Sequence, residues 1–387
     1  MKSHSDRVNK ISSKSIFTEI TLLSKKHNAI DIGHGFPNTP APSFLKKACI
    51  EAVQNDANQY TFPRGRIVLR QLLSEMMKKK CNLFYDPERS IVVTQGATEA
   101  VFCTIMGFVN PGDEVIVFDP CYITYIPGIL MAGGVPRIYP LLPPNWEIDE
   151  QKLRTLFTNK TKLIICNSPH NPTGKVFTKG ELALIAKLCC EYDVVALSDE
   201  VYHELVFEPY KYTSLCSLPG MYERTITVST IGKTFEVTGW KVGWAISTPE
   251  IIDVLLRVRL NTSTCGTTPV QEASTMALKQ SRGYYLDLVE RYKKNRDYLV
   301  QTLSKAGFIP YPSQGTYFLM ASCSPLGFKS DLECVKYLIT DVGIGSIPAS
   351  FLYNATLPQN IQLIRFAFCK DQRTLQEVND RLSKTLF

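Results

Sequence analysis

The first two thirds of the chain alternate short apolar runs with helical patterns. Six runs have the length and composition of strands, at residues 91–93, 114–118, 162–166, 194–197, 225–231 and 243–247. The run at 194–197 is bounded by charged residues, as expected for a strand that is buried on both faces. This alternation predicts an α/β fold in which helices cover both faces of a mostly parallel sheet.

Local signals place several helices between these strands. Apolar residues at helical spacing predict an amphipathic helix over Ser43–Gln54. Thr178 and Glu181 form a capping-box pattern ahead of a helix over residues 182–190. Pro249 is suited to the first position of a further helix.

The pattern changes after Pro269. A long helical stretch reaches about residue 303, and apolar runs follow at residues 318–320 and 363–368. This change predicts a second, smaller α+β domain. Two domains also suit a length of 387 residues, which is long for a single core.

Composition argues against several classes of partner. Hydrophobic residues make up 44% of the chain and charged residues 20%, which is typical of a globular protein. The net charge of +7 is scattered, and its one short run, Lys78-Lys79-Lys80, is typical of a solvated helix face. We therefore expect no binding to nucleic acid. No apolar stretch reaches the roughly 18 residues of a membrane span, so we expect no membrane segment.

The N-terminus and the cysteines suggest a cytoplasmic protein. Residues 1–14 are polar and lack the apolar core of a signal peptide, although a mildly basic, serine-containing start also resembles a transit peptide. The 12 cysteines have no CxxC pair and no regular spacing. Free thiols in a reducing compartment are the simple interpretation, and neither a disulfide framework nor a metal site is expected.

Polar clusters follow four of the predicted strands, and open parallel sheets bind ligands at that end of their strands. The first cluster contains Asp199 and Tyr202, directly after the run at 194–197. A carboxylate at the inner end of an apolar strand needs a cation or a donor beside it. The alternative is that Asp199 caps a helix.

Two further clusters are turns. Asn171-Pro172-Thr173-Gly174 follows the run at 162–166 and is either a plain turn or a means of aiming the Asn171 amide at a cofactor oxygen. Gln95-Gly96-Ala97-Thr98 precedes a helix that we expect to start near Thr98. Its small residues let backbone N–H groups cradle an anion, although a single glycine is weak evidence.

The fourth cluster ends in Gly232-Lys233-Thr234, which resembles the end of a phosphate-binding P-loop. A P-loop needs glycine where Thr227 stands, so we reject nucleotide binding there. Lys233 is left at a strand end, and a partly desolvated lysine is the residue type that forms Schiff bases. Lys241 supplies a second cation for a phosphate. The alternative is that Lys233 is a surface lysine.

Together the clusters occur in the order glycine turn, Asn-Pro turn, Asp-x-x-Tyr and lysine. In this order the chain resembles the class I and II group of fold type I aminotransferases, which depend on pyridoxal phosphate (PLP). The resemblance runs from about Phe17 to Arg373 and is most specific at residues 171–174, 198–202, 230–244 and 363–366. It implies a large PLP-binding domain with a sheet of the seven-stranded type over residues 41–285. Residues 1–40 and 286–387 would form the smaller domain.

The resemblance implies a role for each residue around the cofactor ring. Lys233 would hold PLP covalently and, once released by substrate, would move a proton between the substrate Cα and the cofactor. Asp199 would keep the pyridine nitrogen protonated, which makes the ring an electron sink. Tyr202 and Asn171 would donate to the ring oxygen. Tyr122 would stack on the ring, although it also suits a core tyrosine.

The same resemblance assigns residues to the phosphate, namely Gly96, Ala97, Thr98, Thr230 and Lys241. The family usually has serine where Thr230 stands, and both residue types carry the hydroxyl. Tyr60 would reach the phosphate of a neighbouring subunit. That arrangement implies a homodimer with shared active sites.

Substrate contacts follow in the same way. Arg365 would bind the substrate α-carboxylate through a bidentate pair, and Asn171, Gly35 and Phe17 would line the substrate pocket. The alternative of a surface arginine is disfavoured because charge within the apolar run 363–368 needs a partner.

The segment DIGHGFPN at residues 31–38 resembles the kynurenine, glutamine–phenylpyruvate and methionine transaminase subgroup. The segment TCGTTP at residues 264–269 departs from kynurenine-type members and is closer to the bacterial methionine type. We therefore expect methionine as the favoured amino donor, with aromatic amino acids or glutamine also accepted and a 2-oxo acid as acceptor. Aspartate is disfavoured, since no second arginine clearly suits a side-chain carboxylate. Kynurenine–oxoglutarate transamination is an alternative.

Two other functions are open from the sequence. A PLP-dependent cysteine-conjugate C–S β-lyase would use the same Lys233 to remove the proton and then expel a sulfur leaving group. Some transcription regulators carry an aminotransferase-like domain. They need an added DNA-binding module, for which too few residues precede the fold here.

Overall fold

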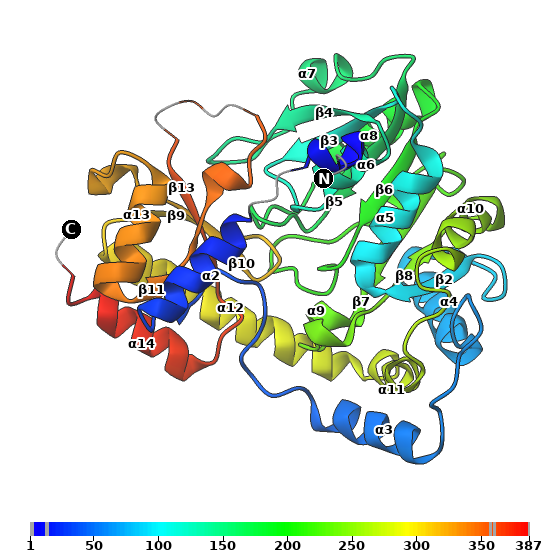
Figure 1. Ribbon diagram of the computed structural model, residues 1–387, viewed down its shortest axis with the longest axis horizontal. Coiled ribbons are helices and arrows are strands. Elements are labelled where there is room, and N and C mark those ends of the chain that lie inside the picture. The colour runs from blue at the N-terminus through cyan, green and yellow to red at the C-terminus, as the bar shows by residue number, and fades with distance from the viewer. Residues whose placement is uncertain (1–3, 12–14, 356–357, 359–360, 386–387) are drawn as a thin grey trace.

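The computed structural model describes residues 4–11, 15–355, 358 and 361–385. Its largest element is a seven-stranded sheet with the order β2-β8-β7-β6-β5-β3-β4 (Figure 1). The strands are β2 (Ile91–Gln95), β3 (Glu114–Asp119), β4 (Val135–Pro140), β5 (Thr161–Asn167), β6 (Val195–Asp199), β7 (Thr225–Thr230) and β8 (Val242–Ile246). β8 runs antiparallel to both of its neighbours, and the other pairs are parallel. The predicted mostly parallel sheet is therefore confirmed.

Helices cover both faces of this sheet (Figure 1). The helices of this part of the chain are α3 (Ser43–Gln54), which packs on α11, and α4 (Ile67–Cys81), α5 (Gly96–Phe108), α6 (Tyr125–Met131), α7 (Glu150–Arg154), α8 (Lys179–Glu191), α9 (Ile231–Thr234), α10 (Pro249–Leu260) and α11 (Thr268–Leu278). Successive strand residues point to opposite faces. Val115 and Val117 thus join the core beneath α5 and α10, whereas Ile116 and Phe118 join the core beneath α8. Burial on both faces explains why these strands are continuous apolar runs.

A second layer of structure comes from the two ends of the chain. β12 (Ile347–Pro348), β13 (Leu363–Ala367), β10 (Phe318–Ser322) and β9 (Ile309–Tyr311) form an antiparallel sheet in that order, and β1 (Ile30–Asp31) pairs with β11 (Ile344–Gly345) in parallel. The helices there are α2 (Ile16–Lys26), α12 (Arg282–Lys305), α13 (Asp331–Tyr337) and α14 (Gln372–Leu382), whereas the short α1 (Asp6–Asn9) lies beside α6 of the large sheet (Figure 1). Short 3₁₀ segments occupy Leu215–Ser217, Thr238–Trp240, Ser324–Leu326 and Ala349–Phe351, and Leu338–Val342 is a π-helix.

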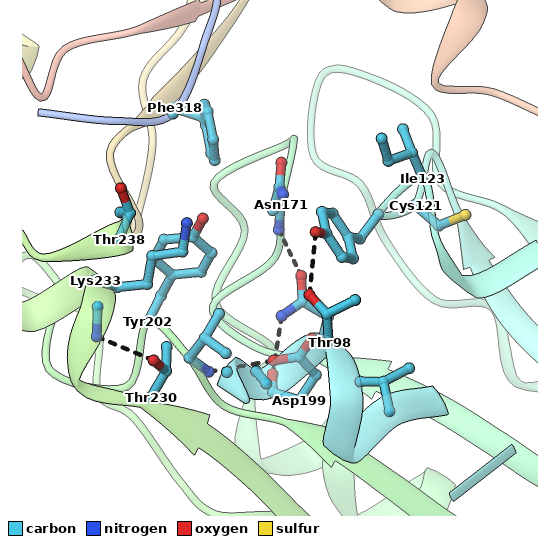
Figure 2. A pocket seen from close by; sticks show the side chains of 18 of the residues that line it. Thr98, Cys121, Ile123, Asn171, Asp199, Tyr202, Thr230, Lys233, Thr238 and Phe318 are labelled. Atoms are coloured by element: carbon cyan, nitrogen blue, oxygen red, sulfur yellow. Dashed lines mark hydrogen bonds between the residues drawn. The ribbon is translucent and has the colours of Figure 1, made fainter. Parts of the chain in front are cut away.

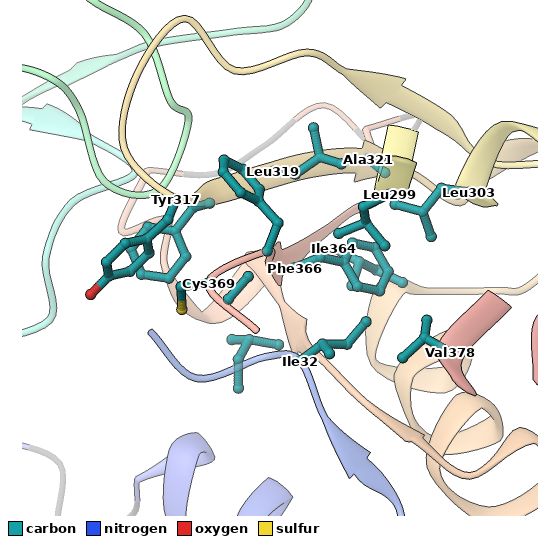
Figure 3. Packing of buried hydrophobic residues seen from close by; sticks show 14 of the residues in the cluster. Ile32, Leu299, Leu303, Tyr317, Leu319, Ala321, Ile364, Phe366, Cys369 and Val378 are labelled. Carbon is teal, nitrogen blue, oxygen red and sulfur yellow. The ribbon is translucent and has the colours of Figure 1, made fainter. Parts of the chain in front are cut away.

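One apolar cluster holds this second layer together (Figure 3). Ile32 from the N-terminal segment packs in the same cluster as Phe366 of β13, Leu299 of α12 and Val378 of α14. All four side chains are almost fully buried. Because residues near both ends of the sequence share this core, the N-terminal segment is fixed against β13. The domain limits 41–285 and 1–40 with 286–387 stay predictions.

Several local predictions are confirmed. α3 spans Ser43–Gln54, as its apolar spacing predicts. The Thr178 hydroxyl accepts from the Glu181 backbone N–H, and the Glu181 carboxylate accepts from the Thr178 backbone N–H, which completes the capping box. Pro249 opens α10.

Other boundaries differ from the prediction. The long helix expected after Pro269 is two helices, because α11 ends at Leu278 and Ser281 is the N-cap of α12. α5 begins at Gly96 rather than near Thr98. β4 carries prolines at 136 and 140, which removes the usual strand signal from its sequence. It lies at the sheet edge, where missing backbone donors are tolerated.

The cysteines are all free thiols. In the part of the chain that the structure describes, no group of three or more His, Cys, Asp or Glu side chains is arranged to hold a metal ion. None of the described helices combines the length and apolarity needed to cross a lipid bilayer.

Candidate active site

A cavity of about 210 Å³ lies at the carboxyl ends of the central strands. It brings together nearly every residue that the sequence indicates for the site, from segments spread over most of the chain. Those lining it are Phe17, Gly35, Gly96, Ala97, Thr98, Tyr122, Asn171, Asp199, Tyr202, Thr230, Lys233, Lys241 and Arg365. Figure 2 shows how several of these side chains converge. Tyr60 is the predicted site residue that does not line the cavity.

Asp199 is the last residue of β6, and its carboxylate is buried. The Tyr125 hydroxyl donates to its Oδ2 at 2.5 Å, and the Val201 backbone N–H donates to its Oδ1 at 3.3 Å. Burial raises the pKa of Asp199 to about 6, against the opposing effects of the Tyr125 hydrogen bond and the Lys233 charge. A buried carboxyl group with this pKa is still mostly ionised at pH 7, and it fits a ligand that brings a cationic N–H into the cavity.

Lys233 lies in α9, the four-residue helix that follows β7. Its Nζ lies 5.6 Å from the ring centroid of Tyr202 and 5.6 Å from that of Tyr317. Burial lowers the pKa of Lys233 to about 8, and the positive charge of Lys241 acts in the same direction. This pKa leaves a fraction of the amine neutral near pH 7, and a neutral amine is a nucleophile and a proton carrier. The surface-lysine alternative therefore does not hold.

The N-terminus of α5 and Lys241 form one end of the cavity. Gly96 has a φ of +72°, and a Cβ there would lie 3.2 Å from the Lys241 Nζ. A Cβ on Gly243 would lie 2.5 Å from the Ala97 nitrogen, so β8 packs directly against this helix start. Backbone N–H groups at the start of a 13-residue helix, with an ammonium group beside them, suit a phosphate.

The Thr230 hydroxyl already has two hydrogen-bond partners within the protein. Its hydroxyl accepts from the Gly232 backbone N–H at 3.0 Å and thereby caps α9. The hydroxyl proton is donated to the Val242 carbonyl at 2.5 Å. Donation to a phosphate would therefore require this last hydrogen bond to exchange.

Asn171 lies where the strand-end loops meet the small sheet (Figure 2). Its backbone N–H donates to the Asn167 side chain at 2.7 Å, and its Oδ1 accepts from Arg365 at 3.3 Å. Across the cavity, the Tyr122 hydroxyl lies 3.4 Å from the Thr98 hydroxyl. These contacts fix polar groups on two sides of the cavity.

Arg365 is a buried cation in β13, only 5% exposed. Its Nη2 donates to the Gly33 carbonyl at 2.9 Å, its guanidinium carbon lies 4.3 Å from the Phe318 ring centroid and 5.3 Å from that of Phe17, and its Nε has no hydrogen-bond partner. Burial lowers the pKa of Arg365 to about 10. Within the described residues no carboxylate pairs with it, so this arginine suits a ligand carboxylate.

Gly35 is required by close packing next to Arg365. A Cβ at this position would lie 2.3 Å from the Phe318 ring, and the Gly35 carbonyl accepts from the Tyr317 hydroxyl at 2.7 Å. Any larger residue would push the N-terminal segment away from β10.

Tyr60 is 91% exposed. It lies beside residues 264–269, the segment from which the sequence favours methionine as amino donor. The Thr268 hydroxyl donates to the Gln59 carbonyl at 2.7 Å, which brings residues 264–268 against the Tyr60 loop. Neither segment lines the cavity of the single chain.

The sequence did not indicate several polar residues of the cavity, among them Thr238. Tyr125 supplies the hydrogen bond to Asp199, and Asn167 joins the Asp199 carbonyl (2.8 Å) to the Asn171 backbone. His34 also lines the cavity. The Asn167 position at the end of β5 is a signal that could have been used, whereas nothing local marks Tyr125, because it lies in a helix.

These residues fit PLP. The buried acid suits the pyridine nitrogen of PLP, and the amine with a lowered pKa suits its aldehyde. The anion cradle suits the phosphate, and the unpaired guanidinium suits the carboxylate of the substrate. When bound, PLP supplies an electron sink for chemistry at an amino acid Cα.

Comparisons with known proteins agree with this chemistry. The chain matches the family model "Aminotransferase class I and II" over residues 27–382. It is 37% identical to kynurenine–oxoglutarate transaminase of Dictyostelium discoideum, across 96% of this chain and 94% of that protein. The structure of YbdL from Escherichia coli, described as having a methionine aminotransferase function, has a TM-score of 0.95 at 32% identity and covers 100% of both chains. N-succinyldiaminopimelate aminotransferase from Mycobacterium tuberculosis has a TM-score of 0.95 at 36% identity, covering 99% of this chain and 100% of that one.

The match extends over all strands of the described sheets and over every segment that lines the cavity except the one that carries Phe17. It agrees with the residue chemistry of the cavity and with the mixed seven-stranded sheet. The chain therefore belongs to the class I and II aminotransferases, and it is a PLP-dependent enzyme that transfers amino groups between amino acids and 2-oxo acids.

Proposed function

We propose that the enzyme moves the amino group of methionine to a 2-oxo acid by a ping-pong mechanism through Lys233, and that it also accepts aromatic amino acids or glutamine. The main support for this proposal is the set of side chains that line the cavity near Arg365. Phe17, Phe318, Ile123 and Leu352 contribute apolar surface there. Such a wall suits a thioether or an aromatic ring, and it lacks a second arginine for a side-chain carboxylate among the described residues.

The proton at the substrate Cα is moved by Lys233. Its pKa of about 8 makes a useful fraction of the amine neutral, so it can take a proton and return it to a neighbouring atom. Asp199 holds a proton on the cofactor nitrogen, and Tyr202 and Asn171 hold the ring oxygen. Arg365 orients the substrate through its α-carboxylate, while Phe17 and Gly35 shape the substrate side.

The phosphate is held by the backbone of Gly96, Ala97 and Thr98 together with Lys241 and Thr230. Tyr122 covers the cofactor ring. The charge of Lys241 beside the start of α5 supports this assignment.

The active unit in this proposal is a homodimer in which Tyr60 reaches the partner's phosphate site. Four apolar side chains that are at least 47% exposed support an interface here: Ile50, Val53, Tyr60 and Phe62. Mixing Lys233→Ala and Tyr60→Ala protomers tests it. Hybrid dimers would have one site with both native residues, so activity should rise well above that of either variant. No rise in mixed dimers would contradict shared sites.

The donor is tested with a visible absorption spectrum of the purified holoenzyme, recorded before and after L-methionine is added without a 2-oxo acid. Methionine should convert the lysine-bound cofactor band to the amine form of the cofactor. L-Aspartate is the control, and a clearly faster half-reaction with aspartate would overturn the methionine assignment. A protein that binds PLP without this band would overturn the role of Lys233.

A second candidate is kynurenine–oxoglutarate transamination, favoured by the name of the Dictyostelium relative. Comparing kcat/KM for kynurenine and methionine with 2-oxoglutarate as acceptor decides between the two donors. The C–S β-lyase alternative is tested in the same series. Pyruvate formed from a cysteine conjugate without any acceptor would support it.

A further inference from the structure

A buried ion pair lies behind the phosphate cradle, which is formed by residues 96–98 at the start of α5. α10 packs along α5 (Figure 1). Arg259, in the last turn of α10, is buried, and its Nε lies 3.4 Å from the Glu99 Oε2. Glu99 lies in the first turn of α5, directly after Thr98. Neither Arg259 nor Glu99 lines the cavity, so any effect on a ligand passes through the start of α5.

The Glu99 carboxylate fixes the backbone at which the cradle begins. Its Oε2 accepts from the backbone N–H of Gln95, the N-cap of α5, at 2.6 Å. Its Oε1 accepts from the hydroxyls of Thr262 and Ser263, in the loop that follows α10. Glu99 therefore holds the cradle in place, but it also puts a negative charge in the turn of the helix that must attract a phosphate.

Arg259 is placed to offset this negative charge. Among the described residues, it is the cationic side chain that forms an ion pair with Glu99. Its Nη1 donates to the Thr264 carbonyl at 2.8 Å and to the Pro63 carbonyl, so backbone from two loops keeps the guanidinium beside Glu99. Charges in a buried site are weakly screened. Without Arg259, the uncompensated Glu99 carboxylate would repel an anion in the cradle.

We infer that Arg259 and Glu99 are positioning residues for the cofactor phosphate. Glu99 anchors the backbone of the cradle, and Arg259 neutralises Glu99 so that the cradle stays favourable for an anion. The inference rests on the proposed binding of the phosphate by Gly96, Ala97 and Thr98, and it extends that proposal to the residues behind them.

Pyridoxal, which is PLP without the phosphate, provides the test. The measurement is the dissociation constant of each compound, obtained by titrating the cofactor-free protein and following the visible band. The ratio of the two constants reports the contribution of the phosphate, because changes that affect the ring or Lys233 act on both compounds. Arg259→Gln should lower the preference for PLP over pyridoxal roughly tenfold, with pyridoxal binding changed by no more than about twofold, as expected for one uncompensated charge near the phosphate.

Two further variants separate the charges. Glu99→Gln removes the negative charge and keeps an oxygen for the Gln95 N–H, so its preference for PLP should rise about threefold above that of wild type. Combining it with Arg259→Gln makes the pair neutral again, so the double variant should return to within about threefold of wild type. Arg257→Gln, at an exposed position on the same helix, is the matched control and should behave as wild type.

Near-UV circular dichroism of the cofactor-free proteins confirms that each variant is folded, and Glu99→Gln alone decides if Arg259→Gln does not fold. The inference would be overturned by an unchanged preference in Arg259→Gln, by an equal loss of PLP and pyridoxal affinity, or by a double variant as weak as Arg259→Gln. A Glu99→Gln preference at or below that of wild type would also overturn it. A wild-type protein with no preference for PLP over pyridoxal would instead contradict the proposed phosphate site, and this inference with it.

Discussion

The two walls of the active-site cavity are built from different parts of the chain. The sheet wall, formed by Thr98, Asn171, Asp199, Tyr202 and Lys233, comes from loops and helices that follow neighbouring strands. The outer wall, formed by Phe17, His34, Gly35, Phe318 and Arg365, joins the two ends of the chain, and its Arg365–Gly33 hydrogen bond spans 332 positions.

The two walls also differ in the environment of their charged side chains. On the sheet wall, Asp199 and Lys233 influence each other, and burial moves the pKa of each toward neutral pH. On the outer wall, Arg365 keeps its charge between aromatic rings with one nitrogen unsatisfied. We conclude that the sheet wall suits proton transfer and cofactor retention, whereas the outer wall suits recognition of the substrate carboxylate.

Replacing the sheet-wall amine should have the largest effect. Lys233→Ala should lower kcat by roughly 10⁴-fold or more, because both the covalent anchor and the proton carrier are lost. Single-turnover kinetics and the visible cofactor band measure it. Lys211→Ala, on the exposed surface, is the control. Substantial activity in Lys233→Ala would break the assignment of chemistry to the sheet wall.

Neutralising Asp199 should lower the activity of the enzyme but raise the stability of the cofactor-free protein. Asp199→Asn should lower kcat about a hundredfold or more, because the cofactor nitrogen loses its counter-charge. Since burial raises the folded-state pKa of Asp199 above its unfolded value, ionisation costs stability as the pH rises from about 4 to above 6.

The cofactor-free Asp199→Asn protein should therefore be more stable than wild type at pH 7, by on the order of 2 kcal/mol, with the difference vanishing near pH 3.5. Denaturant unfolding at the two pH values measures it. Equal stability at pH 7 would argue against a strained carboxylate on the sheet wall.

On the outer wall, Arg365→Lys should lower kcat/KM for methionine by about a hundredfold, mostly through KM. Lysine keeps the charge but loses the paired donors that fit a carboxylate. Steady-state kinetics provide the measurement, with the exposed Arg373→Lys as control. A loss confined to kcat would place Arg365 in the chemistry and break the division between the walls.

The smallest effect is expected for Tyr125→Phe, which removes the hydrogen bond to Asp199. That bond lowers the Asp199 pKa, so its loss should move the acid limb of the kcat/KM profile to higher pH. Activity at pH 7 should fall roughly five-fold, the value of about one hydrogen bond, and recover toward pH 8.5. Tyr210→Phe, which is exposed, should leave the profile unchanged.

The sheet wall was largely predictable because its residues follow apolar strands within a few positions. Asp199, Asn171 and Lys233 each end or follow such a run, and parallel strands bring those ends to one edge. Tyr125 was not predictable, since its contact with Asp199 crosses 74 positions from a helix. β4 was missed because its prolines hide an edge strand.

The sequence by itself determined the order of strands and helices, the strand-end motifs and, through them, the family. The spacing of hydrophobic residues and the turn residues are signals that involve only a few neighbouring positions, so both can be recognised in the sequence. Only the tertiary structure decided that the N-terminal segment lies against β13, which sets Asp31 and His34 beside Arg365. Contacts between distant segments depend on packing of the shared core, and no local pattern encodes them.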